Sequence, residues 1–175
     1  RSVILYVGRL VAQKRVANLI QACSGMDGAC ELLIVGDGPE RPKLQALAQS
    51  AFPDTRFLGH RSGDDLAVCF AAADLFVLPG SGGLALQEAM AHGVPAIVAS
   101  GDGTEADLVK DGHNGYQVPA GDVLVLRKTL DDAIADAGRL KEMGRRSREV
   151  VENGHNLDAM VDAFLDALDL VSSRR

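Results

Sequence analysis

The stretch LPGSGGLALQEAMAHGVPAIVAS, Leu78 to Ser100, decides the fold. It reads as the end of a buried strand, a Gly-rich turn, an apolar helix that carries the carboxylate of Glu88, and a second buried strand. A helix N-terminus gathers unpaired N–H groups and partial positive charge, and glycines beside it let a ligand approach the backbone closely. The stretch therefore predicts a strand–helix–strand unit whose turn holds an anionic, hydroxyl-rich ligand such as a nucleotide.

Apolar runs of strand length recur along the chain on both sides of this unit. The six runs are Val3–Val7, Glu31–Val35, Thr55–Leu58, Leu75–Leu78, Ala96–Ala99 and Gly115–Val118. The segments between most of them have helical periodicity. Strands that are apolar on both faces and alternate with helices are typical of a parallel sheet covered on each side. Right-handed crossovers then predict an α/β fold with a doubly wound, Rossmann-like sheet.

The length of 175 residues fits one domain, so we expect residues 1–175 to form a single unit. From about Asp122 the pattern is helical to the end, and three segments are expected with breaks at Gly138, Gly144 and Gly154. The last segment, 156–171, carries an apolar stripe that by default packs on its own domain. The first residue is not Met and a strand pattern begins almost at once, so we expect a domain of a longer protein.

Composition excludes several classes of function. The chain is 47% hydrophobic and 24% charged with a net charge of −6, and its basic residues form no long block, which argues against nucleic acid as the main partner. No apolar run is long enough to span a bilayer and the first residues lack a signal-peptide pattern. Three cysteines outside any CxxC pair indicate reduced thiols in a cytoplasmic protein. The four histidines have no metal-ligand spacing, and neither a P-loop nor a nucleophile elbow occurs.

Five loops should meet at the carboxyl edge of the predicted sheet, where ligands of this fold class bind. They are Gly8–Lys14, Gly36–Arg41, Gly59–Gly63, Pro79–Gly83 and Ser100–Glu105, and they hold ten of the sixteen glycines before the helical tail. Turns of this kind also need glycine for structural reasons alone. The clustering of glycines at one edge nevertheless favours a binding site there.

Four charged side chains at this edge are candidates for contact with a ligand. Arg9 and Lys14 suit a clamp for a diphosphate, and the alternative is a pair of solvated cations. Glu88 suits hydrogen bonds from two ribose hydroxyls, and the alternative is a carboxylate that only complements the helix dipole. Glu105 is expected to face the ligand.

The turn GDGPE, Gly36 to Glu40, favours a structural interpretation. It resembles a dinucleotide-binding G-x-G-x-x-G, but Arg41 stands where the third glycine belongs and the turn follows the wrong strand. A tight turn in which Pro39 opens a helix explains it.

These motifs in their order resemble the C-terminal lobe of GT-B glycosyltransferases, in particular the large retaining family 4, the glycosyl transferases group 1. The resemblance covers nearly the whole chain. It rests on GRL-x3-K from Gly8 to Lys14, the GDGP turn, FLG at Phe57–Gly59, AAADLFVLP, EAMAHGVPAIVAS and the E-x6-G-x2-G block that starts at Glu105.

The resemblance implies a lobe that binds a UDP- or GDP-linked sugar as substrate, with no metal and no other cofactor. Arg9 and Lys14 match the positions that grip the donor diphosphate and stabilise its charge as it leaves. Glu88 matches the second glutamate of the family's Glu-x7-Glu motif, which holds the ribose, and the loop Gly59–Arg61 matches the one against which the base lies. The full set of expected donor-binding residues is Gly8, Gly59, His60, Arg61, Ser81, Gly82, Gly83, Leu84, Glu88 and Glu105, with Arg9 and Lys14 as the catalytic pair.

Two positions depart from the family pattern. Gly80 stands where the first glutamate of Glu-x7-Glu belongs, so the backbone N–H groups of Ser81 to Gly83 are expected to take up phosphate charge instead. The pair Lys14-Arg15 replaces the usual Lys-Gly.

The resemblance also implies a partner. The acceptor site and the other wall of the cleft would come from an N-terminal lobe that this sequence lacks, so the chain alone is expected to be inactive. Any association with the inner membrane face would run through that lobe.

Two other functions remain open at this point. A non-catalytic module that binds nucleotide or protein is supported by Gly80. A nicotinamide-dependent oxidoreductase is disfavoured by the incomplete glycine fingerprint.

Overall fold

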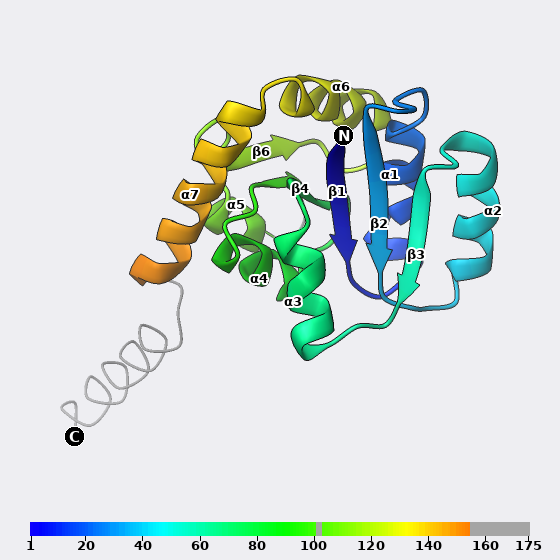
Figure 1. Cartoon of the computed structure of the whole chain (residues 1–175), viewed down its shortest axis with the longest axis horizontal. Coiled ribbons are helices and arrows are strands. Elements are labelled where there is room, and N and C mark those ends of the chain that lie inside the picture. Colours follow the sequence, from blue (N-terminus) through cyan, green and yellow to red (C-terminus); the bar gives the residue numbers. More distant parts are fainter. Residues whose placement is uncertain (101–102, 155–175) are drawn as a thin grey trace.

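Six parallel strands in the order β3-β2-β1-β4-β5-β6 form the centre of the molecule, and helices cover both faces (Figure 1). The computed structural model describes residues 1–100 and 103–154. The strands are β1 (Ser2–Val7), β2 (Cys30–Val35), β3 (Thr55–Gly59), β4 (Leu75–Leu78), β5 (Ala96–Ala99) and β6 (Gly115–Val118). The helices are η1 (Ala12–Lys14, a 3-10 turn), α1 (Val16–Ala22), α2 (Arg41–Ala51), α3 (Gly63–Ala71), α4 (Ala85–Ala91), α5 (Thr104–Leu108), α6 (Val123–Ile134) and α7 (Ala137–Gly154). The predicted doubly wound sheet is confirmed, and each predicted strand agrees with an observed one to within a residue at either end.

The sheet divides the core into two apolar layers, because successive side chains of a strand point to opposite faces. On β1, Ile4 and Tyr6 pack in the layer covered by α1, α2 and α6. Leu5 packs in the opposite layer, which α3, α4, α5 and α7 cover. Both faces of the central strands are therefore buried, which explains their continuous apolar sequence.

The break between helices α6 and α7 does not lie at any of the predicted glycines. The only interruption between residues 123 and 154 falls at Ala135–Asp136, and the Asp136 carboxylate accepts a hydrogen bond of 2.9 Å from the Arg139 N–H. Gly138 and Gly144 lie inside α7, so the prediction of breaks there was wrong. At Gly144 a Cβ would lie 2.0 Å from the carbonyl oxygen of Gly93, so glycine here serves close packing of α7 on the turn after α4. The predicted segment 156–171 lies outside the described residues.

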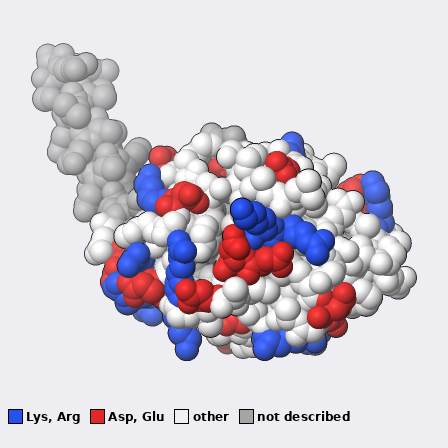
Figure 2. All heavy atoms as spheres, turned by 90° about the horizontal axis from the view of Figure 1, so that it is seen from above, with Lys and Arg blue, Asp and Glu red and all other residues white. Residues whose placement is uncertain are grey.

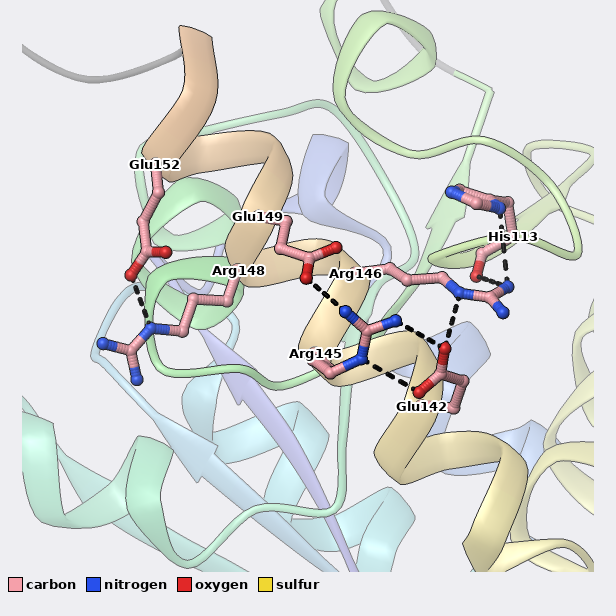
Figure 3. Close-up of polar contacts among 7 residues, drawn as sticks. All are labelled: His113, Glu142, Arg145, Arg146, Arg148, Glu149 and Glu152. Atoms are coloured by element: carbon pink, nitrogen blue, oxygen red, sulfur yellow. Dashed lines mark hydrogen bonds and ion pairs between the residues drawn. The ribbon is translucent and has the colours of Figure 1, made fainter.

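Helix α7 is fastened to the turn before β6 by polar contacts. Buried Ser147 donates a 2.6 Å hydrogen bond to the Asn114 carbonyl, and Arg146 donates to the His113 carbonyl at 3.3 Å. On the outer side of α7, Figure 3 shows Glu142 between Arg145 and Arg146, with ion pairs at i+3 and i+4 spacing. The Arg145 and Arg146 guanidinium groups lower the pKa of Glu142 to about 2.

Acidic and basic side chains lie next to one another on the face seen in Figure 2, where neither sign forms a continuous field over the described residues. No described helix has the length and the apolar character that crossing a membrane requires.

Candidate functional site

The carboxyl ends of β1 and β4 lie side by side at the centre of the sheet, because these two strands are paired in the order β2-β1-β4-β5. After β1 the chain turns into α1 on one face, and after β4 it turns into α4 on the other. The two loops therefore leave the sheet toward opposite faces, at the kind of switch point where doubly wound sheets bind ligands. In Figure 1 the arrows of β1, β2 and β3 point down toward this edge.

The turn after β1 is held rigidly against the turn after β2. Two glycines permit the close approach: a Cβ on Gly36 would lie 2.0 Å from the Gly8 carbonyl oxygen, and one on Gly38 would lie 2.4 Å from the Leu10 carbonyl oxygen. The Leu10 N–H donates to the Asp37 carbonyl at 2.9 Å. The GDGP turn thus has the structural role expected of it, although α2 begins at Arg41, two residues after Pro39.

Tyr6 of β1 holds the start of the turn after β1 in place. Its ring is fully buried, and its hydroxyl donates a 3.0 Å hydrogen bond to the Arg9 carbonyl. Burial raises the pKa of this phenol above its ordinary value, so the hydroxyl keeps the proton that it donates. Tyr6 therefore orients the backbone from which the Arg9 side chain projects.

Lys14 connects the loop after β1 to the loop after β4. Its ammonium group donates to the carbonyl of Ser81 at 2.8 Å and to that of Gly82. An ammonium has three N–H donors, so one remains for a further acceptor. The half-buried Lys14 ammonium thus packs against the β4–α4 loop, at the centre of the ligand-binding edge.

Residue 80 has no room for a side chain. A Cβ on Gly80 would lie 2.3 Å from the Gln13 carbonyl oxygen and 2.7 Å from the carbonyl carbon of Lys14. The main chain of η1 occupies the space that a glutamate at this position requires. The Ser81 N–H also points to the Gln13 carbonyl, at 3.4 Å. It is therefore not free for a phosphate, contrary to what the sequence suggested for this one residue.

A first cavity of about 430 Å³ lies beyond the ends of β1, β2 and β3. Four of the predicted site residues meet in its wall: Gly8, Arg9, His60 and Arg61. Asp37 also lines the cavity. The Gly38 N–H and the Arg41 guanidinium hold the pKa of this carboxyl below its usual range, so it is engaged in its own turn. Exposed cations thus border a cavity that is otherwise largely apolar.

A second cavity, of about 300 Å³, lies between the β4–α4 loop and α5. The predicted residues Gly82, Gly83, Leu84 and Glu105 all line it. The Glu105 side chain is 2% exposed, and neither of its carboxylate oxygens has a hydrogen-bond partner among the described residues.

The remaining predicted residues take other places. Glu88 lies half-buried in α4 and lines neither cavity. In the described part of the chain its carboxylate has no hydrogen bond or ion pair, while its carbonyl accepts from the His92 ring at 2.9 Å. Gly59 ends β3 with φ +72°, a conformation suited to glycine, so it shapes the loop that carries His60 and Arg61. Residues 101–102 of the predicted loop Ser100–Glu105 lie outside the described residues.

Sequence reasoning missed two residues that the structure assigns to this edge. Tyr6 interrupts an apolar strand with a hydroxyl group, and that was the signal available for it. Gln87 lines the second cavity and had a similar signal, a polar residue between the apolar positions of α4.

The arrangement offers a polyanion at least two cations, Arg9 near the start of the β1–α1 connection and Lys14 near its end. Preorganised cations of this kind stabilise charge that develops on a leaving phosphate. Over residues 1–100 and 103–154 there is no group of three or more His, Cys, Asp and Glu side chains placed to hold a metal ion.

Comparison with known proteins gives a consistent result. Residues 1–150 match the model of the family glycosyl transferases group 1. The chain is 37% identical over 161 residues to a GDP-mannose-dependent alpha-mannosyltransferase of Corynebacterium glutamicum, a match that covers 87% of this chain and 36% of that protein. The chain therefore spans little more than a third of this relative.

Two solved structures show the same fold. Sucrose-phosphate synthase from Thermosynechococcus elongatus superposes with a TM-score of 0.88 at 26% identity, over 99% of this chain and 46% of that one. The C-terminal domain of a glycosyl transferase group 1 family protein from Francisella tularensis superposes with a TM-score of 0.78 at 20% identity, over 89% and 87% of the two chains.

Proposed function

The chain belongs to the glycosyl transferases group 1, and on that premise we propose that it is the lobe of a retaining glycosyltransferase that binds the nucleotide-sugar donor. The observation that carries the proposal is the Lys14 ammonium, which links the loops after β1 and β4 and contacts Gly82 in the wall of the second cavity, while Arg9 of the same β1–α1 segment lines the first cavity. A nucleoside diphosphate has the matching chemistry: a base for the first cavity and two phosphates for the cations.

Arg9 and Lys14 would neutralise the diphosphate as its bond to the sugar breaks. This is electrostatic help, and it requires no nucleophile from this lobe. The phosphates would lie along the β1–α1 turn, and the base would enter the cavity beside His60 and Arg61. Glu88 lines neither cavity, and it would hold the ribose after its side chain turns toward the ligand.

The relative that uses GDP-mannose favours a GDP-linked hexose, and a UDP-linked donor is the alternative. We further propose that a second lobe supplies the acceptor site, because this chain spans only part of its relatives. The enzyme would act on the cytoplasmic side, and any membrane contact would be made by the second lobe.

The test is a calorimetric titration of the chain with GDP, UDP and ADP. We expect saturable binding of one of them, weakened at least about tenfold by Arg9→Ala, since a hydrogen bond to a charged group contributes ~1.5–3 kcal/mol. The matched control is Arg56→Ala, which removes an exposed arginine of β3 outside both cavities and should leave the affinity unchanged. Binding that tolerates Arg9→Ala as well as Arg56→Ala would contradict the site.

Gly80 favours one alternative, a lobe that binds nucleotide without supporting sugar transfer. With glycine at position 80, the site lacks the first carboxylate of the Glu-x7-Glu motif. A transfer assay on the full-length protein separates the two functions. Turnover that depends on Arg9 supports the enzyme, whereas nucleotide binding without turnover supports the non-catalytic module.

A further inference from the structure

The second cavity is lined by a buried carboxylate that accepts no hydrogen bond from the described residues. Glu105 is 2% exposed, and both of its side-chain oxygens lack a partner among the described residues. Burial of a polar group without hydrogen bonds is costly, and such groups in native structures are nearly always satisfied. The cavity has a volume of about 300 Å³, at the small end of the ~300–1,000 Å³ range typical of small-molecule sites. Glu105 is thus poised to accept hydrogen bonds from a ligand that enters there.

The chemistry of the wall narrows the choice of ligand. Gln87 adds an amide that both donates and accepts, while Leu84, Leu86 and Leu108 supply apolar surface. A carboxylate, an amide and aliphatic side chains together suit a small polyol, whose hydroxyls donate to oxygen and whose C–H groups pack on leucine. Gly82 and Gly83 allow such a ligand to approach the loop backbone.

The cavity also lies next to the cation that would hold a diphosphate. Lys14 donates to the carbonyl of Gly82, and a Cβ on Gly83 would lie 3.8 Å from its ammonium nitrogen. Both glycines line the second cavity. A group attached to a diphosphate at Lys14 would therefore reach the cavity of Glu105 without crossing the first cavity.

We infer that Glu105, assisted by Gln87, binds the hydroxyl groups of the sugar ring of the donor. This inference rests on the proposed function and extends it to the sugar. Residue 80 cannot supply a carboxylate, since the main chain of Gln13 and Lys14 occupies its side-chain space. Glu105 reaches the other side of the same loop from α5 and provides the hydrogen-bond acceptor there.

The test compares the affinity of the chain for GDP with that for GDP-mannose, or UDP with UDP-glucose if the uridine nucleotide is the one that binds. The ratio of the two dissociation constants measures what the sugar contributes. In the wild type we expect the sugar to strengthen binding by roughly tenfold, the effect of one hydrogen bond to a charged group. Glu105→Gln should bring the ratio close to one and leave the affinity for the nucleoside diphosphate unchanged.

Asp107→Asn is the matched control, because Asp107 is an exposed carboxylate on the same helix and should leave the ratio at its wild-type value. If Glu105→Gln does not fold, Gln87→Leu decides the question, with a reduced ratio expected. A wild-type sugar contribution that survives in the folded variant, or that is absent in the wild type, overturns the inference while the proposed function stands. Failure of the wild type to bind any nucleoside diphosphate overturns both.

Discussion

At position 80 the packing leaves no room for the glutamate of the family pattern, and the chain has glycine there. The backbone of η1 lies against its Cα, so even a methyl group would meet main-chain atoms at 2.3–2.8 Å. The sequence revealed the substitution but not its cause, because the contact joins residues nearly seventy positions apart. The absence of a carboxylate and the position of Lys14 are thus consequences of one close contact.

Gly80→Ala should destabilise the chain by about 1–3 kcal/mol, the usual cost of overpacking, since backbone must shift to admit the methyl group. Chemical denaturation followed by circular dichroism measures the change. Gly83→Ala is the control: its Cβ would meet only the Lys14 ammonium at 3.8 Å, so its stability should stay close to that of the wild type. Equal stability of the two variants would refute the steric account.

Arg15 is a second residue with a local cost. It has φ +51° and ψ +34°, the left-handed region, where an L side chain is disfavoured by roughly 1–2 kcal/mol. A glycine, which the family pattern described above places at this position, would adopt this conformation without strain.

The corresponding prediction is that Arg15→Gly stabilises the chain by about 0.5–1 kcal/mol, because relief of strain exceeds the added entropy of the unfolded chain. The urea midpoint should rise. Ala17→Gly, two residues further on inside α1, should lower it by about 1 kcal/mol. A lower midpoint for both variants would show that the left-handed conformation carries no strain.

Individual elements were predictable to the extent that their signal is periodic. The strands followed from unbroken apolar runs, which only a sheet covered on both faces requires. The break between α6 and α7 did not, because Gly138 and Gly144 are usual helix breakers in isolation. The packing of Gly144 on Gly93 reverses that preference, and a contact between distant segments has no local signal. Loop positions in the site followed from strand ends, whereas the partners of Lys14 and the burial of Glu105 depend on side-chain packing.

Helix α7 yields a prediction about pH. The pKa of Glu142 is lowered from 4.5 to about 2 by Arg145 and Arg146, so the ionised carboxylate stabilises the folded state above about pH 4.5. That contribution should be lost as the pH falls from 4.5 toward 2. Glu142→Gln should therefore lower Tm at pH 7, and the difference from the wild type should shrink across this window.

Asp132→Asn, at an exposed position of α6, changes the net charge by the same amount and serves as the control. Thermal unfolding at several pH values measures all three proteins. A Tm difference for Glu142→Gln that is constant with pH, or equal to that of the control, would exclude the ion pairs as its source.

At the scale of the whole molecule, the strand order brings loops from distant parts of the chain to one edge. The turns after β1, β2 and β3 border the first cavity, the β4–α4 loop and α5 border the second, and Lys14 contacts the β4–α4 loop. The doubly wound topology was predicted from the alternation of strands and helices, whereas the order of the six strands was not. The sequence did not predict which polar side chains the packing leaves without a hydrogen-bond partner.

The most direct test of the donor-lobe account is to map nucleotide binding onto the backbone. Titration of the isotopically labelled chain with GDP and UDP, followed by amide NMR shifts, identifies the residues that sense the ligand. We predict saturable shifts confined mainly to the loops 8–14, 60–62 and 79–88 at the carboxyl edge of the sheet. Shifts centred on the opposite edge, at the small cavity of about 120 Å³ lined by Ser2, Asp74 and Lys141, or no saturable shift with either nucleotide, would contradict it.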